Sequence, residues 1–196
     1  MQGGHGKQSW RAGERLAVMS PTGGCATRII RAVMESPEPT RLATALQRGV
    51  VEAIHVHPPG ERSQPMVRID AAVLDAGTGI QGDRYAGLGI PGSHITFIAA
   101  EGIEGMVSRT GIPLTAAETR RNVLTRGVDV NALVGRRFRV GDAVCLGVKP
   151  CTPCDHLESL TRPGVRSGLS GQGGLRADVL VGAIIRPGDA IEELDG

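Results

Sequence analysis

The sequence predicts a mainly β domain, a closed or folded-over β-barrel with a few short helices. Its apolar segments are short, rich in β-branched residues and separated by turn residues, and only two stretches have helical spacing. The 196 residues include 29 glycines and 12 prolines, which suits many turns better than a helix bundle. Aromatic residues make up 2% of the chain, so Val, Ile, Leu and Ala must form most of the core.

The expected strands follow one another along most of the chain, and each is bounded by Gly, Pro or Asp. They cover residues 50–56, 66–74, 94–98, 122–125, 137–140, 143–149, 177–185 and 190–193. The spacing of Ile103, Met106 and Val107 predicts a short helix over residues 99–109. A capping box over residues 115–118 predicts a second short helix, which ends near position 121.

The first 48 residues differ from the rest of the chain. They contain six glycines, seven basic residues and only three acidic ones, and they show no sustained periodicity. We expect residues 1–48 to form a poorly ordered or loosely packed N-terminal extension, with short helices near residues 26–34 and 42–47. Residues 49–196 are expected to form the barrel domain.

Composition excludes several functional classes. Residues 49–196 contain fifteen basic and seventeen acidic residues and few aromatics, so we expect no nucleic-acid partner. No apolar run approaches the ~18 residues of a membrane span, so we expect no membrane partner, and no secretion signal is evident. Three of the four cysteines lie within residues 145–154. Together with the missing signal, this indicates reduced thiols in a cytoplasmic protein.

The segment 149–158 contains the densest group of potentially reactive side chains in the sequence. It places the thiols of Cys151 and Cys154 close to the imidazole of His156. Prolines at positions 150 and 153 fix two φ angles and remove two backbone donors, which predicts a stiff loop rather than a helix interior. A preset loop with paired thiols suits a metal ligand, a sulfur carrier or a redox pair.

Four interpretations of this loop remain open. Cys151, Cys154 and His156 can bind zinc, but a structural zinc site needs four ligands, and we expect His55 and His57 to lie far from the loop. A redox pair requires a strand-to-helix junction within a βαβ unit, which a β-rich chain does not predict. The third interpretation is one activated thiolate, Cys151 or Cys154, beside basic groups. The fourth is two inert, buried cysteines.

Two further motifs carry charge. Residues 77–82 match the G-x-G-x-x-G pattern, but the glycines and proline that follow cannot form the required helix, so we interpret the match as turns. Asp83 and Arg84, held between glycines, can present a guanidinium to a phosphate or carboxylate, or Asp83 can cap backbone amides. Arg121 and Asn122 form a second candidate pair for an anionic ligand.

Five blocks of sequence, taken in order and spacing, resemble the MOSC domain, the C-terminal domain of molybdenum-cofactor sulfurases that also occurs as stand-alone bacterial proteins. They are residues 80–87, 93–98, 119–135, 138–142 and 151–158. The resemblance extends over residues 50–194. It implies a β-barrel of the pyruvate-kinase type and a role in handling the molybdenum–pterin cofactor, with a cysteine as sulfur carrier or molybdenum ligand.

Applied to this sequence, the resemblance assigns the cysteine role to Cys154 or Cys151, with Cys154 as the expected molybdenum ligand. It assigns the pterin or its phosphate to Arg121, Asn122 and Arg84. The expected cofactor-binding residues, with the two neighbouring polar groups included, are Arg84, Arg121, Asn122, Asp83 and His156.

Three functions follow as hypotheses. The first is a protein that binds the molybdenum cofactor and that, if it is an enzyme, reduces N-hydroxylated or related small compounds, with electrons from a separate donor protein because the chain contains no flavin or iron–sulfur motif. The second is a non-enzymatic sulfur carrier that receives a persulfide from a donor protein, and the third is a structural zinc module. Pyridoxal phosphate is not expected, because the only lysines, Lys7 and Lys149, lie in no Schiff-base context.

Overall fold

The fold is that of a computed structural model, which describes residues 46–195. The helix expected near residues 26–34 and most of the expected N-terminal extension lie outside the described residues. The strands are β1 (Arg48–Val56), β2 (Val67–Ile69), β3 (Ala72–Asp75), β4 (Gly79–Ile80), β5 (Ile95–Ala99), β6 (Val123–Arg126), β7 (Arg137–Val140), β8 (Ala143–Pro150), β9 (Leu175–Val181), β10 (Ile184–Ile185) and β11 (Ala190–Glu193). The helices are α1 (Ala100–Thr110), α2 (Asp155–Leu160) and α3 (Val165–Gly168), with 3₁₀ turns η1 (Ala117–Thr119) and η2 (Val130–Leu133).

Seven strands close into a barrel, in the order β1-β6-β5-β9-β8-β7-β11, and β11 pairs again with β1. Neighbouring strands are antiparallel except for β5 and β6, which are parallel and joined through α1. The register of β1 against β6 shifts between Val51 and Ala53, and such a bulge bends a strand. The bend lets β1 pair with β11 at its start and with β2 at its end.

Two hydrophobic clusters flank the barrel wall. One fills the interior, where the rings of Phe97 and Phe138 pack edge to face with centroids 5.3 Å apart. The other lies between the barrel and the helices. On β5, Phe97 belongs to the interior cluster and Ile98 to the outer one, which explains why the first four residues of this strand are buried in succession. The outer face of β5 also carries the polar Thr96, which is important for the site.

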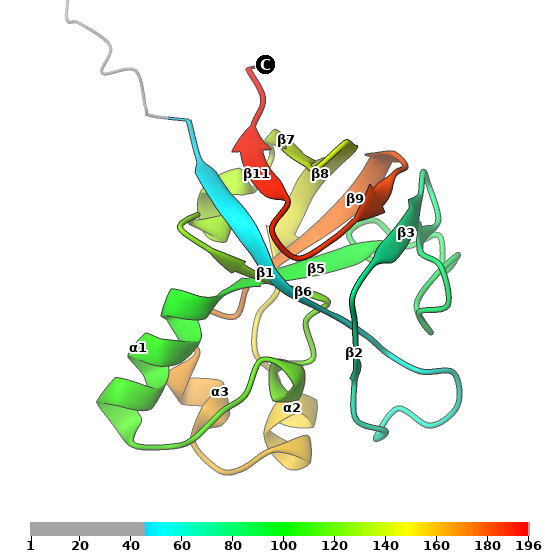
Figure 1. Cartoon of the computed structure of the whole chain (residues 1–196). Helices are drawn as coiled ribbons and strands as arrows, with labels where there is room; N and C mark the ends of the chain where they lie inside the picture. The colour runs from blue at the N-terminus through cyan, green and yellow to red at the C-terminus, as the bar shows by residue number, and fades with distance from the viewer. Residues whose placement is uncertain (1–45, 196) are drawn as a thin grey trace, which may run out of the picture. The chain divides into compact units, whose positions relative to one another are not determined.

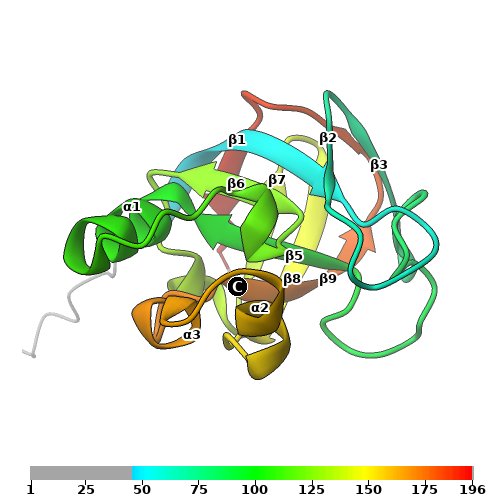
Figure 2. The same cartoon turned by 90° about the horizontal axis from the view of Figure 1, so that it is seen from below.

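The three helices gather against the same part of the barrel in both views (Figures 1 and 2). Their apolar side chains form the outer cluster, including Met106 of α1, Leu157 of α2 and Val165 of α3. Helix α1 ends at Gly111, whose left-handed φ of 70° lets its amide bond the carbonyl of Val107. Packing of the helices on one side leaves the adjoining strand ends open to a cavity.

The predicted closed β-barrel is confirmed, and the helix predicted over residues 99–109 corresponds to α1. The strands predicted over 66–74 and 177–185 are each divided in two, because the chain passes from the barrel to the small sheet β10-β3-β4. The capping box forms as expected, since the backbone amide of Thr115 donates to Glu118 at 2.8 Å, but it opens only the three-residue turn η1.

The prediction of a loop throughout residues 149–158 is wrong beyond Cys154. The next residue begins α2, and the sequence interpretation did not anticipate this helix or α3. The sequence does contain a signal for the start of α2. Asp155 and Glu158 lie in its first turn, where acidic side chains interact favourably with the positive end of the helix dipole. The carboxylate of Glu158 then accepts the backbone amides of Gly164 and Arg166, which connects α2 to α3.

Gly174 is a position where only glycine fits. Its φ is +100°, and a Cβ there would lie 2.1 Å from the carbonyl oxygen of Phe97 in β5. We expect Gly174→Ala to lower the free energy of unfolding by about 3 kcal/mol or more in urea denaturation. Gly171→Ala is the matched control, since its φ is +73° with no atom nearby, and it should cost about 1 kcal/mol. Equal losses in the two variants would contradict the close approach of β5 and β9.

Candidate functional site

A cavity of about 320 Å³ opens where the ends of β1, β5, β6 and β9 meet the segment between β8 and α2. It brings together the thiols of Cys151 and Cys154 with the imidazoles of His57 and His156. Leu88 and Tyr85, from the segment before β5, contribute to its wall. Thiols, imidazoles and apolar surface within one cavity are the composition expected of a ligand site.

The cavity is positively charged. Four arginines line it, Arg62, Arg120, Arg121 and Arg176, and no carboxylate does so among the described residues. Arg176 lies on β9 directly across from Thr96, and its guanidinium has no hydrogen-bond partner in residues 46–195. Such a set of guanidinium groups favours an anionic ligand with phosphate or carboxylate groups.

Arg120 is held by its backbone as well as by its side chain. It is the one non-glycine residue with positive φ among the described residues, at 63°, and it ends η1. Its guanidinium donates to the carbonyl oxygens of Gln64 at 2.6 Å and Arg62 at 2.8 Å. The turn therefore connects the segment 57–66 to the rim of the cavity.

Arg121 is 7% exposed and joins three segments through their backbone carbonyls. Nε donates to Gly173 at 2.8 Å, Nη1 to Thr119 at 2.8 Å and Nη2 to Cys151 at 3.0 Å. Burial lowers the pKa of the guanidinium, while the nearby thiols oppose that shift. Two of its five N–H groups remain for a ligand, so its main visible action is to fix the cysteine segment.

The cysteine segment is held from both sides. The amide of Cys151 donates to the carbonyl of Gly174 at 2.7 Å. Gly173 packs so closely that a Cβ there would lie 2.4 Å from the carbonyl oxygen of Cys151. At the other end, Leu157 is buried among the outer cluster. As a result Cys151 is buried, while Cys154, at the start of α2, is exposed.

The third described cysteine plays a different part. Cys145 lies inside the barrel, fully buried among apolar side chains. Burial, with a smaller contribution from Asp178, raises the pKa of its thiol to about 12. A thiol that stays protonated is a poor nucleophile and a poor metal ligand, so Cys145 is a core residue.

A buried hydrogen-bond network lies beneath the cavity. Asp83 Oδ2 accepts the backbone amide of His57 at 2.8 Å, its ring Nδ1 at 3.1 Å and Asn122 Nδ2 at 2.9 Å. Asp83 Oδ1 accepts the amide of Tyr85 at 2.9 Å. Asn122 Oδ1 accepts the amide of Thr96 at 3.1 Å and its hydroxyl at 2.8 Å. The network connects β1, β5, β6 and the segment after β4.

Of the residues singled out from the sequence, five line the cavity: Cys151, Cys154, His156, Arg121 and Asn122. Asp83 lies beneath the cavity, where it caps backbone amides, one of the two roles considered for it. Arg84 is not among the lining residues, because Nε and Nη2 both donate to the carbonyl of Pro58.

Sequence reasoning did not assign several of the lining residues to the site, among them His57, Arg62 and Arg176. It considered His57 only as a zinc ligand too distant from the cysteine segment, and the described residues indeed contain no group arranged to hold a metal ion, but His57 does line the same cavity as both cysteines. Arg120 forms an arginine pair with Arg121 in the sequence, so it belongs to the motif that indicated the site, although it was not assigned a role there. Arg176 had no motif to indicate it, and only its outward position in the alternation of β9 reveals it.

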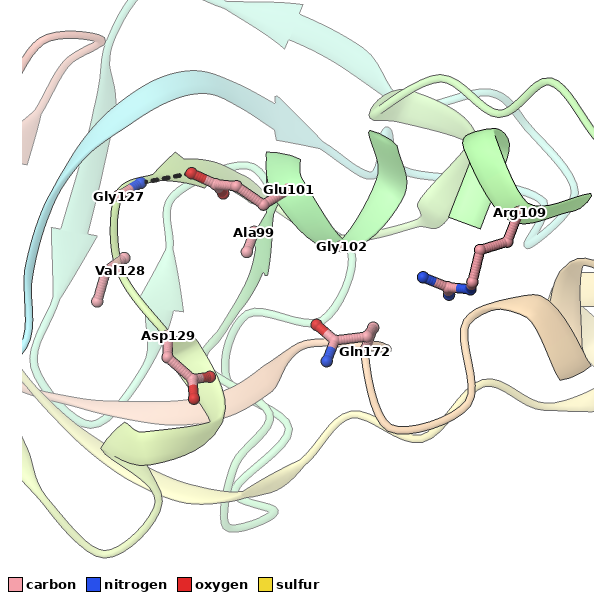
Figure 3. A pocket seen from close by; sticks show the side chains of 8 residues that line it. All are labelled: Ala99, Glu101, Gly102, Arg109, Gly127, Val128, Asp129 and Gln172. Carbon is pink, nitrogen blue, oxygen red and sulfur yellow. Dashed lines mark hydrogen bonds between the residues drawn. The ribbon is translucent and has the colours of Figure 1, made fainter. Parts of the chain in front are cut away.

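A separate hollow of about 550 Å³ lies near the start of α1 (Figure 3). Its lining includes Glu101, Arg109, Asp129 and Gln172, and Glu101 accepts the amide of Gly127 at 2.8 Å. It has no thiol or imidazole, and its charges are of both signs. The chemistry of this hollow does not match that of the cysteine cavity.

The described residues contain no group of three His, Cys, Asp or Glu side chains arranged to hold a metal ion. A closed structural zinc site requires four such ligands. Within residues 46–195 the third hypothesis, a structural zinc module, therefore has no site.

A family model of the MOSC domain matches residues 80–192, more than half of the chain. This chain belongs to the MOSC family. The family is generally associated with binding of the molybdenum cofactor. The match contains the network residues Asp83 and Asn122 and both cysteines of the cavity.

Solved structures share the fold of this MOSC protein. The YuaD protein from Bacillus subtilis is 19% identical, with a TM-score of 0.64, and the alignment covers 76% of this chain and 96% of that one. YiiM from Geobacillus stearothermophilus is 17% identical with a TM-score of 0.59, covering 75% of each chain. YiiM from Escherichia coli is 17% identical with a TM-score of 0.55, covering 76% and 70%.

No curated protein sequence gives a significant match to this MOSC protein. In the described part of the chain, no helix combines the length and apolar character that crossing a membrane requires.

The role of Arg121 in fixing the cysteine segment can be tested by Arg121→Lys. The change keeps the charge but cannot donate to three carbonyls in one plane, so buried carbonyl groups lose their partners. We expect a loss of about 2–4 kcal/mol in the free energy of unfolding, and faster hydrogen exchange at the amide of Cys151.

Arg139→Lys is the matched control, because Arg139 forms an exposed ion pair with Glu192, which contributes little. Unchanged exchange at Cys151 in the Arg121 variant would show that the segment is held by other contacts.

Proposed function

We propose that this MOSC protein binds a molybdenum–pterin cofactor in the cysteine cavity, with Cys154 as the molybdenum ligand, and reduces N-hydroxylated small molecules. The observation that carries the proposal is the exposed thiol of Cys154 in a cavity lined by four arginines and no carboxylate among the described residues. The family supports the cofactor, and the donor chemistry of the cavity agrees with it.

The residues present suit such a cofactor. A thiolate is a soft ligand that matches molybdenum and sulfur chemistry, and guanidinium groups match phosphate. Ser93 adds a separate argument, because this residue lines the cavity and its hydroxyl is buried without a hydrogen-bond partner in the described residues. Buried hydroxyls normally have a partner, so a polar ligand would satisfy this one.

Each lining residue then has a role. Arg120 and Arg176 would bind the anionic end of the pterin, and Arg176 is free to do so because its guanidinium has no partner in the described part of the chain. Asn122 and His156 would bind polar atoms of the same ligand. Arg121 would add charge while it holds the cysteine segment in place.

When bound, the cofactor supplies the two electrons that reduce an N–O bond, and it must be re-reduced by a separate donor protein. The protein residues hold the substrate near the thiol ligand and exclude water. Leu88 and Ile90 give the mouth of the cavity an exposed apolar edge, 49% and 56% exposed, against which the carbon part of a substrate can pack.

A sulfur-carrier function has one observation in its favour. Cys154 is exposed and starts α2, so a donor protein can reach its sulfur, while Cys151 close by is buried. A carrier would hold a persulfide on Cys154 and would not need to retain molybdenum.

Metal analysis and thiol mass spectrometry of protein made in a molybdopterin-competent host test the proposal. We expect the wild type to retain molybdenum and Cys154→Ser to retain less than about a tenth as much, because the thiolate bond is lost. Cys151→Ser carries the same chemical change at the buried thiol and should keep most of the metal.

Molybdenum retained equally by Cys154→Ser and the wild type would contradict the assignment of the ligand. Loss in Cys151→Ser alone would assign the ligand to Cys151. A thiol adduct of one added sulfur without metal would favour the sulfur carrier.

A further inference from the structure

His57 occupies a special position in the cavity. It follows β1 directly, and its side chain is 5% exposed, yet its ring lines the same cavity as Cys151 and Cys154. Ring atom Nδ1 lies 3.1 Å from Asp83 Oδ2, and the ring of Tyr85 packs against the imidazole at 4.8 Å, nearly perpendicular. The imidazole is therefore fixed on two sides, with its other nitrogen, Nε2, unpaired among the described residues.

Asp83 holds a negative charge in this network. Burial by itself would raise the pKa of its carboxyl, but hydrogen bonds from His57 and from the amide of Tyr85 outweigh burial and lower it. Asn122 Nδ2 donates to the same carboxylate at 2.9 Å. An ionised carboxylate only accepts, so the proton shared with His57 is on Nδ1, and in the neutral ring Nε2 has a free lone pair.

The orientation of Asn122 is fixed independently. Its Oδ1 accepts both the amide and the hydroxyl of Thr96, and its Nδ2 donates to the carbonyl of His55 at 3.1 Å. A rotated amide would lose these bonds, so Nδ2 must face Asp83. The carboxylate is thus oriented by neighbours that are themselves fixed.

We infer that His57, positioned by Asp83, is the proton donor of the reduction in this cavity. This inference rests on the proposed function. His57 takes a proton from solvent at Nε2, and Asp83 stabilises the resulting imidazolium. The proton then passes from Nε2 to the leaving oxygen of the N-hydroxylated substrate.

In the step that His57 would assist, the N–O bond breaks as the substrate takes up two electrons, which the cofactor would supply when bound. One proton comes from His57 to the departing oxygen and a second from solvent, so an amine and one water molecule are formed. His57 is neutral again after the step and is reprotonated from solvent.

The cavity around His57 is rich in basic groups. The charged and titratable groups that share the cavity with His57 are Arg62, Arg120, Arg121, Arg176, Tyr85, Cys151, Cys154 and His156, and Arg84 follows Asp83 in the chain. Asp83 is the carboxylate that contacts the ring, with Oδ2 3.1 Å from Nδ1, so its negative charge lies beside the imidazole that would carry the proton.

The first test compares His57→Gln with His94→Gln in the full-length protein loaded with molybdenum. The control removes a partly buried imidazole that does not line the cavity and whose Nδ1 accepts the amide of Val179. With phenylhydroxylamine as probe and reduced methyl viologen as electron donor, we expect kcat of His57→Gln to fall by about 100-fold or more. KM and molybdenum content should change by less than about threefold, and His94→Gln should keep most of its kcat.

The second test does not depend on turnover. Nitrogen-15 NMR of the full-length protein as purified, with the His57 signals assigned from their absence in His57→Gln, should show Nδ1 protonated and Nε2 unprotonated in the neutral ring. Asp83→Ala removes the acceptor and should give a mixture of the two tautomers. If that variant does not fold, the tautomer in the wild type and the kcat of His57→Gln still test whether His57 is the proton donor.

The outcomes separate the two proposals. If wild type retains molybdenum and turns over, but His57→Gln keeps its kcat or Nε2 holds the proton, the inference about His57 is wrong while the proposed function stands. If wild type retains no molybdenum and reduces nothing, the proposed function fails and the inference fails with it.

Discussion

The buried guanidinium of Arg121 is the contact on which the arrangement of the site depends. It donates hydrogen bonds to three backbone carbonyls, which lie in the turn before β6, in the glycine pair before β9 and in the cysteine segment. Buried carbonyls without a donor are costly, so the guanidinium stabilises the relative positions of these segments, together with the bond from the Cys151 amide to Gly174. The result is that Cys151 is buried and Cys154 faces outward at the start of α2.

The closed barrel is rigid, and the hydrogen bonds around Asp83 connect the cavity residues to the ends of its strands. Strand ends of a closed barrel are fixed by pairing on both sides, so groups attached to them are better placed than groups on long loops. Asp83 itself comes from a segment outside the barrel, and it becomes fixed through His57 on β1's end and Asn122 at the start of β6. The soft thiol, the positive charge and the oriented imidazole therefore belong to one framework.

The closed barrel could be predicted because its strands are short, patterned and bounded by turn residues. The cysteine segment and Asn122 could be found from local motifs. His57 could not, because its place in the same cavity as Cys154 follows from the order of strands in the barrel, which the alternation of apolar residues does not specify. Asp155 and Glu158 are sequence signals for the start of helix α2. The two prolines just before the helix favour a loop, and this signal dominated the prediction.

We propose that the sulfur of Cys154 bonds molybdenum within an anion-binding cavity. X-ray absorption spectroscopy at the molybdenum edge, on wild type and Cys154→Ser from a molybdopterin-competent host, can detect this bond. We expect one fewer sulfur neighbour around the molybdenum that the variant retains. An identical sulfur shell in both proteins would contradict it.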